Sequence, residues 1–286
     1  MKTHIYNVNN YKIIYVPIQT DDVLVSSLVK FSEIHEDKEL CGISHLLEHV
    51  LLNSWDKYKP YEISKVLLEK GVDINATTFD EYVSYYAYGN IRHGSFLIDY
   101  IGDIMTKAKI VDKVVNTEKK SIRQELLGYL QSDENEVNQH IWDTFVPNSS
   151  IALNNNMKFL IKNLKNLTPS VVRKFYKNAY IPNNLTFIIL GNKSKRIHLV
   201  NQLKKKLRKP KSTNSICNIY RFPKLNVINK PKFIDITRSD MVKSSVHMVF
   251  VKPTESSLRK ALVLDMVGHI LSCLLYTSDA ADERLR

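Results

Sequence analysis

The chain has 286 residues, of which 44% are hydrophobic and 24% charged, and its formal net charge is +12 at pH 7. This composition indicates a folded protein with one large or two ordinary cores, and it excludes disordered and collagen-like chains. Three cysteines are too few for a disulfide scaffold or a four-cysteine zinc site. No apolar run approaches the roughly 20 residues that a bilayer requires, and no signal or transit pattern opens the chain. We therefore expect a cytoplasmic protein without a membrane span.

Strand-like and helix-like patterns follow one another along residues 1–210 and predict an α+β domain. Strands are predicted at Lys12–Pro17 and Val23–Phe31, within Val72–Tyr88, and at Pro182–Gly191. Helices are predicted from Gly42 onward and at Tyr61–Lys70, His93–Lys107, Val111–Leu130, Thr168–Asn178 and His198–Leu207. The Asn-rich stretch Asn148–Asn156 shows no clear period.

The C-terminal part of the chain changes character. Residues 211–230 lose periodicity and are rich in Lys, Pro, Ser and Asn, which is typical of a linker. Residues 231–272 then show two strand patterns followed by a helical pattern at Ser257–Leu271. This order is similar to the start of the chain and predicts the beginning of a second α+β domain.

Residues 273–286 differ from the rest of the sequence. The segment beginning Cys273-Leu-Leu-Tyr-Thr-Ser-Asp-Ala-Ala-Asp-Glu resembles the translation of a transposon-type sequencing adapter. Such a tail is not expected to be part of the native fold. The natural protein is then expected to continue beyond Ser272, and 231–272 would be the truncated start of its second domain.

A basic run from Lys204 to Lys211 carries part of the positive charge. It allows the hypothesis of a nucleic-acid interface, which would show salt-steep binding. No aromatic interleaving and no nucleic-acid-binding motif accompany the run. A solvated helix end followed by a linker is therefore the favoured interpretation, with no nucleic-acid partner.

The segment His45-Leu-Leu-Glu-His49 contains the residues with the clearest chemistry. On a helix, residues four apart share a face, so both imidazoles point to the same side. Two imidazole nitrogens suit Zn²⁺, and Glu48 is placed to take a proton from a zinc-bound water. The pattern predicts a catalytic zinc site with Glu48 as general base.

A catalytic zinc site needs a third protein ligand, which we expect from the helix Val111–Leu130. Glu118 and Glu125 are two helical turns apart there and lie on one face. Either carboxylate could bind the metal, while the other hydrogen-bonds a ligand histidine. The spacing alone leaves this choice open.

The motif and its surroundings resemble the pitrilysin/insulinase family of metallopeptidases, whose inverted HxxEH motif follows a glycine, as in Gly42-Ile-Ser-His-Leu-Leu-Glu-His49. The acidic pair Glu118-Lys-Lys-Ser-Ile-Arg-Gln-Glu125 is similar to the family's later helix in both pattern and spacing. The resemblance implies that His45, His49 and Glu125 bind one zinc ion per chain, and that Glu118 supports the site.

A further block, Gly71-Val-Asp-Ile-Asn-Ala-Thr-Thr, is similar to the family's strand beside the zinc. The resemblance implies that this strand lies at a sheet edge and that Asn75 and Ala76 bind an added substrate strand. It also implies a two-layer metallohydrolase domain, in which a mixed or antiparallel sheet is packed with helices.

Two functions follow as hypotheses from the resemblance. The first is a zinc-dependent endopeptidase or oligopeptidase that cleaves peptides or unfolded proteins through a metal-bound water. The second is a non-catalytic family member that acts as a partner subunit or scaffold. In both, a second family domain is expected, either in the missing C-terminal part or on a partner subunit.

Overall fold

The computed structural model describes residues 2–207, 232–235, 262–263 and 266–268. The chain forms two compact units, Met1–Ile236 and Thr237–Arg286. Of the second unit, residues 262–263 and 266–268 are helical, and they lie within the helix predicted at Ser257–Leu271. The predicted linker (211–230), the adapter-like tail (273–286) and most of the predicted second domain (231–272) lie outside the described residues.

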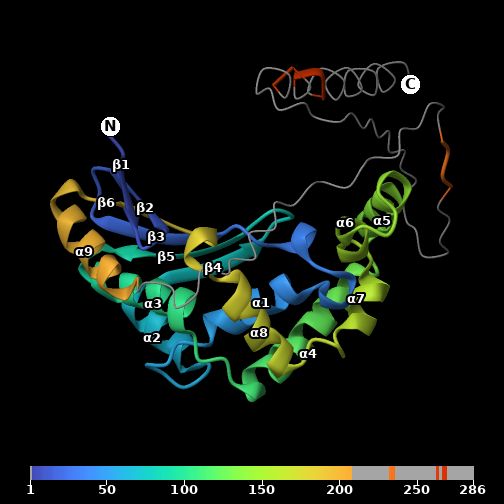
Figure 1. Ribbon diagram of the computed structural model, residues 1–286, viewed down its shortest axis with the longest axis horizontal. Helices are drawn as coiled ribbons and strands as arrows, with labels where there is room; N and C mark the ends of the chain where they lie inside the picture. Colours follow the sequence, from blue (N-terminus) through green and yellow to red (C-terminus); the bar gives the residue numbers. More distant parts are fainter. Residues whose placement is uncertain (1, 208–231, 236–261, 264–265, 269–286) are drawn as a thin grey trace, which may run out of the picture. The chain divides into compact units, whose positions relative to one another are not determined.

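The first unit is built on a mixed sheet that has six strands in the described part of the chain (Figure 1). In spatial order the strands are β1 (His4–Val8), β2 (Tyr11–Pro17), β6 (Leu185–Gly191), β3 (Asp22–Val29), β5 (Val83–Asn90) and β4 (Asp73–Thr78). Strands β2 and β6 are parallel, and the other neighbours are antiparallel. Because β4 is an edge strand, one side of its main chain has no strand partner among the described residues.

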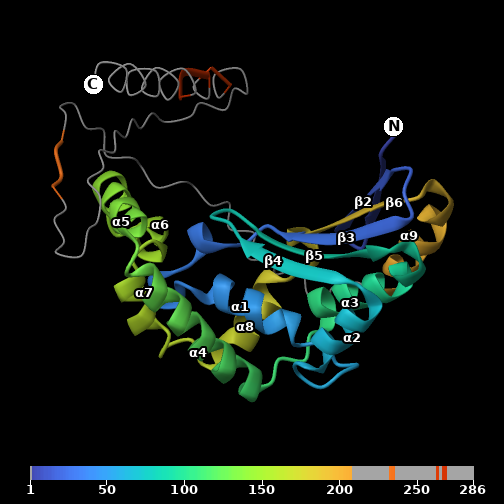
Figure 2. The ribbon, with the colours of Figure 1, turned by 180° about the vertical axis from the view of Figure 1, so that it is seen from behind.

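Helices cover one face of the sheet, as Figures 1 and 2 show from opposite sides. The α-helices in the described part of this unit are α1 (Ile43–Leu52), α2 (Glu62–Lys70), α3 (Gly94–Lys107), α4 (Asp112–Tyr129), α5 (Asp133–Phe145), α6 (Ser150–Asn154), α7 (Met157–Asn163), α8 (Pro169–Ala179) and α9 (Arg196–Lys206). Helix α1 packs against β4, α4 and α8. This arrangement confirms the predicted α+β class, with a mixed sheet packed with helices. None of the described helices is long and apolar enough to cross a membrane.

The hydrophobic core lies between the sheet and these helices. Along β6 the alternate residues Leu185, Phe187 and Ile189 are almost completely buried, as expected for a strand with one face on the core. From the helical side, α3 contributes Leu97 and Ile98, which are fully buried. Burial of each such side chain contributes about 1.5–3 kcal/mol to the stability of the fold. The packing of α3 on the sheet therefore stabilises the layer on which the other helices lie.

Several elements were not anticipated by the sequence patterns, among them β1 and α5. The strand-like segment at residues 72–88 is a hairpin of two strands, β4 and β5. The poorly patterned Asn-rich stretch contains α6, and α7 follows it. Both helices are only five to seven residues long, too short to show a helical period, and they begin at the side-chain caps Ser149 and Asn156.

Candidate metal centre

Helix α1 presents the motif because its apolar residues occupy the opposite face. Leu46, Leu47, Val50 and Leu51 are fully buried, whereas His45, Glu48 and His49 are only partly buried. This division follows from the 3.6-residue period of the helix. The two imidazoles therefore lie together, with ring centroids 5.0 Å apart.

The start of α1 is held by a buried carboxylate from outside the helix. The residue preceding the helix is Gly42, whose φ of +86° is a left-handed conformation that suits glycine. Gly42 and Ser44 donate their backbone N–H groups to Glu36, one to each carboxylate oxygen, at 2.8 Å. The Asn154 side chain donates to the same carboxylate at 3.0 Å. Glu36 thus takes the place of a side-chain N-cap, which Gly42 cannot provide.

Helix α4 places Glu125 opposite the two histidines. Its Oε2 atom lies 3.6 Å from His45 Nε2 and 3.7 Å from His49 Nε2. The three possible ligand atoms lie within 4.8 Å of one another. Two ligand atoms bound at about 2.1 Å to a tetrahedral zinc would be about 3.4 Å apart. Two imidazole nitrogens and one carboxylate oxygen at these distances fit a catalytic zinc site with an open fourth position.

Glu118, one of the two predicted carboxylates, lies behind His49. Its Oε2 atom is 3.4 Å from His49 Nδ1, and its Oε1 atom accepts a 2.8 Å hydrogen bond from the Tyr61 hydroxyl. Burial opposes ionisation of Glu118, but the hydrogen bonds from His49 and Tyr61 outweigh it and hold its pKa below the usual value. The structure thus separates the two carboxylates: Glu125 faces both histidines, and Glu118 faces the far nitrogen of one.

The protonation tendencies of the two histidines differ. Burial lowers the pKa of His45, against the charge of Glu125, and so favours the neutral imidazole that binds metals. Burial also opposes the charged form of His49, but the hydrogen bond with Glu118 outweighs it and raises the His49 pKa. A proton on Nδ1 of His49, held by Glu118, leaves Nε2 free to face Glu125.

Strand β4, the predicted binding edge for a substrate, is in contact with α1, the helix that carries the His45–His49 motif and is called the motif helix below. The Thr78 hydroxyl, at the end of β4, donates a hydrogen bond to Glu48 on α1. Asn75 is exposed on the same strand, and its side-chain oxygen accepts a 2.9 Å hydrogen bond from the N–H of Ala76. The edge strand that carries Asn75 and Ala76 therefore adjoins the helix that carries Glu48.

The sequence patterns assign no role at the site to three residues of this region: Glu36, Tyr61 and Thr78. Tyr129 hydrogen-bonds Glu125, which raises the pKa of its phenol. Tyr61 was placed inside a predicted helix, but it precedes α2 with a left-handed φ of 70°. Such a φ is unusual for a bulky residue, and here it accompanies the contact with Glu118. The helical period already places Tyr129, one turn after Glu125, on the same face of α4 as the two carboxylates.

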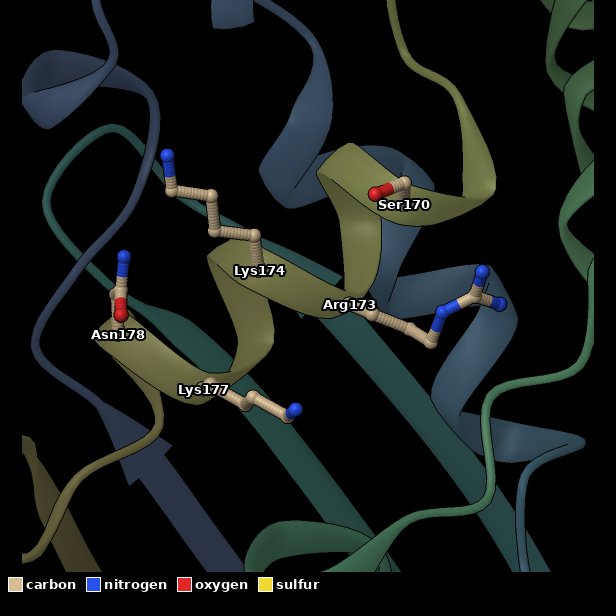
Figure 3. Close-up of a pocket in the computed structure, with 5 residues that line it drawn as sticks. All are labelled: Ser170, Arg173, Lys174, Lys177 and Asn178. Carbon is tan, nitrogen blue, oxygen red and sulfur yellow. The ribbon is translucent and has the colours of Figure 1, made fainter.

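Two other features lie apart from this group. The depression in Figure 3 is lined by residues of α8 only, namely Ser170, Arg173, Lys174, Lys177 and Asn178, and by none of the predicted site residues. In the basic run, Lys206 bonds Asp99 at 2.9 Å and the buried Asp103 at 2.7 Å, and Lys204 lies 4.5 Å from the Tyr6 ring centroid. These contacts give both lysines structural roles. Residues 208–211 of the run lie outside the described residues.

Comparison with known proteins assigns the chain to a class. Residues 15–154 match the model of the insulinase family (peptidase family M16), and residues 166–277 match the model of the M16 inactive domain. Together the two models match most of the chain, which therefore belongs to the insulinase (M16) family. The second match begins at residue 166 and so includes α8 and β6, and β6 is an inner strand of the sheet of the first unit. The domain boundaries predicted near 210 and 231 stay a prediction.

The similar proteins include zinc proteases from bacteria. An uncharacterized zinc protease of Streptomyces coelicolor is 28% identical over 159 residues, which are 55% of this chain and 34% of that one. The uncharacterized zinc protease YmxG of Bacillus subtilis is 24% identical over 158 residues, which are 55% of this chain and 38% of that one. The chain thus spans about a third of the length of these relatives.

A solved structure shares the fold. A protease from Helicobacter pylori superposes with a TM-score of 0.66 at 19% identity, covering 78% of this chain and 53% of that one. The zinc-protease names of the relatives and the His-His-Glu group agree in pointing to zinc at the level of the family.

Proposed function

We propose that the chain is a zinc-dependent peptidase that acts as an endopeptidase or oligopeptidase. The single observation that carries this proposal is the group formed by His45, His49 and Glu125, with Glu48 beside it on the same helix as the histidines. The zinc-protease names of the relatives support the same metal. We propose one zinc ion per chain.

Each residue of the proposed site has a separate task. Zinc, when bound, supplies Lewis-acid polarisation of the scissile carbonyl and lowers the pKa of water to about 7. Glu48 takes a proton from the attacking water and delivers it to the leaving amine. Glu118 fixes the ring of His49 through Nδ1, so that Nε2 is directed toward the site.

The proposed substrate is an extended peptide or an unfolded protein segment. It would add to the open edge of β4 near Asn75 and Ala76, with main-chain hydrogen bonds that depend little on side chains. A second family domain, in the same polypeptide or on a partner subunit, would cover the bound peptide. The match of residues 166–277 to a second M16 domain supports that part of the proposal.

Hydrolysis of an internally quenched peptide library by the zinc-loaded chain tests the proposal. Glu48→Gln should keep the metal and lose about 10²–10⁴-fold in turnover, the range typical of a general base. A family member that serves only as a partner subunit or scaffold would show no such loss. Equal activity of the wild-type and Glu48→Gln chains would reject the peptidase proposal.

A further inference from the structure

The last residue of β4, Thr78, links the edge of the sheet to the motif helix. Along this strand, Ala76 is buried and Thr78 is half-buried, whereas the intervening Thr77 is exposed. Successive side chains of a strand point to opposite faces. Thr78 therefore points to the helical side, where its hydroxyl donates to Oε2 of Glu48.

The main chain of Thr78 faces in another direction from its side chain, toward the open edge. Phe79 N–H donates to the Tyr82 carbonyl across the hairpin, and Thr78 is opposite Val83 in the register. In an antiparallel pair, residues alternate between those that hydrogen-bond the partner strand and those that do not. Thr78, one residue before Phe79, thus directs its N–H and C=O groups away from β5, to the side where no strand of the described part of the chain is paired.

Two properties make threonine suited to hold a carboxylate. Its β-branched side chain has few χ1 rotamers, so a hydroxyl on a paired strand is held in a narrow range of positions. A hydrogen bond donated to a carboxylate also restricts that group and is stronger than one between neutral partners. Glu48 lies on α1 and has a flexible side chain, and the hydrogen bond from Thr78 restrains its carboxylate directly.

We propose that Thr78 is a positioning residue that orients Glu48 for proton transfer and couples this orientation to the addition of a peptide strand at β4. The proposal rests on the proposed function, because it takes Glu48 as the general base. One residue would meet the peptide through its main chain and the base through its hydroxyl. Thr78 itself takes and gives no proton in the reaction.

The expected consequence is a loss in kcat with little change in KM. Thr78→Val keeps the shape and the β-branch but lacks the hydroxyl, so the main-chain edge that meets the peptide is retained. Misorientation should remove part of the general-base contribution, and we expect a loss of about tenfold in kcat. Thr78→Ser keeps the hydroxyl and should restore kcat to within about threefold of the wild type.

The experiment measures kcat, KM and zinc content for the full chain and four variants. Thr77→Val is the matched control, because it makes the same change one residue away on the exposed face. Glu48→Gln reports whether the base is used at all. A large loss in Thr78→Val, recovery in Thr78→Ser and no change in Thr77→Val, all with unchanged zinc content, would support the proposal.

Two results would overturn it in distinguishable ways. If the wild type is active, Glu48→Gln is inactive, and Thr78→Val equals the wild type, the positioning role fails while the proposed function stands. If wild type and Glu48→Gln are equally active or both inactive, the proposed function fails, and the positioning role fails with it.

A measurement without turnover checks the contact itself. In the metal-free chain, the drop in thermal midpoint caused by Thr78→Val should be smaller in a Glu48→Ala background than in the wild type, since contacting residues are not additive. Equal drops in both backgrounds would show that the hydroxyl does not act through Glu48 and would overturn the proposal.

Discussion

Replacement of Glu36 by glutamine tests how the motif helix is held. The carboxylate is 5% exposed, and its two oxygens accept from the N–H groups of Gly42 and Ser44. An amide of the same shape presents NH₂ in place of one oxygen, so one of these N–H groups faces a donor. A buried N–H left without an acceptor costs roughly 1–3 kcal/mol. Because a neutral amide is easier to bury than a carboxylate, we expect a net loss of about 2 kcal/mol in the free energy of unfolding.

Chemical denaturation of the metal-free chain measures this loss, and thermal unfolding should show a decrease of about 4–8 °C in the midpoint. Glu39→Gln is the matched control, because it removes the same charge from an exposed side chain nearby. It should change stability by less than about 0.5 kcal/mol. The reasoning would be refuted if Glu36→Gln were as stable as the wild type, or if both variants lost the same amount.

Three other predictions concern pH, metal affinity and the basic run. Burial and the neighbouring acidic groups raise the pKa of Glu33 to about 8, above its unfolded value of 4.5, so the stability that its protonated form contributes is full below pH 4.5 and is lost as pH rises through 8. Glu33→Gln should therefore reduce the decline of the denaturation midpoint between pH 5 and pH 9. A decline as steep as that of the wild type would contradict this prediction. Tyr61→Phe removes the hydroxyl that bonds Glu118 and should weaken zinc binding about tenfold in a chelator competition, whereas unchanged affinity would exclude this role. Lys206→Met removes a partner of the buried Asp103 and should lower the free energy of unfolding in urea by about 1–2 kcal/mol. Lys205→Met, at an exposed position, should leave it unchanged. Equal effects of the two variants would refute the structural role of Lys206.

The residue pairs of the site that lie on a single helix could be predicted from the sequence alone. The spacing of His45 and His49 requires only a helix to bring them together, and the apolar residues between them indicate which face is buried. The Glu118 and Glu125 pair follows from the same period on α4. Spacing alone did not separate their tasks. That separation depends on the distances between helices, which place Glu125 against both imidazoles and Glu118 against one.

The supporting residues could not be predicted in this way, because each acts across the fold. Glu36 precedes α1 in an irregular segment and returns to its first turn, and Thr78 reaches Glu48 from a strand. Tyr61 reaches Glu118 only because its backbone takes a left-handed conformation. The position of β6 at the centre of the sheet is equally non-local, since its strand pattern alone does not indicate its neighbours. In all four cases tertiary packing decides the contact.

The most direct test of the central claim is the zinc content of the purified chain, measured by elemental analysis. The account predicts about one zinc per folded wild-type chain after dialysis, and about the same for Glu48→Gln. The His49→Ala/Glu125→Gln double variant should retain its fold and contain almost none. A folded wild-type chain without zinc, or a double variant that keeps its full zinc content, would contradict the proposed metal centre.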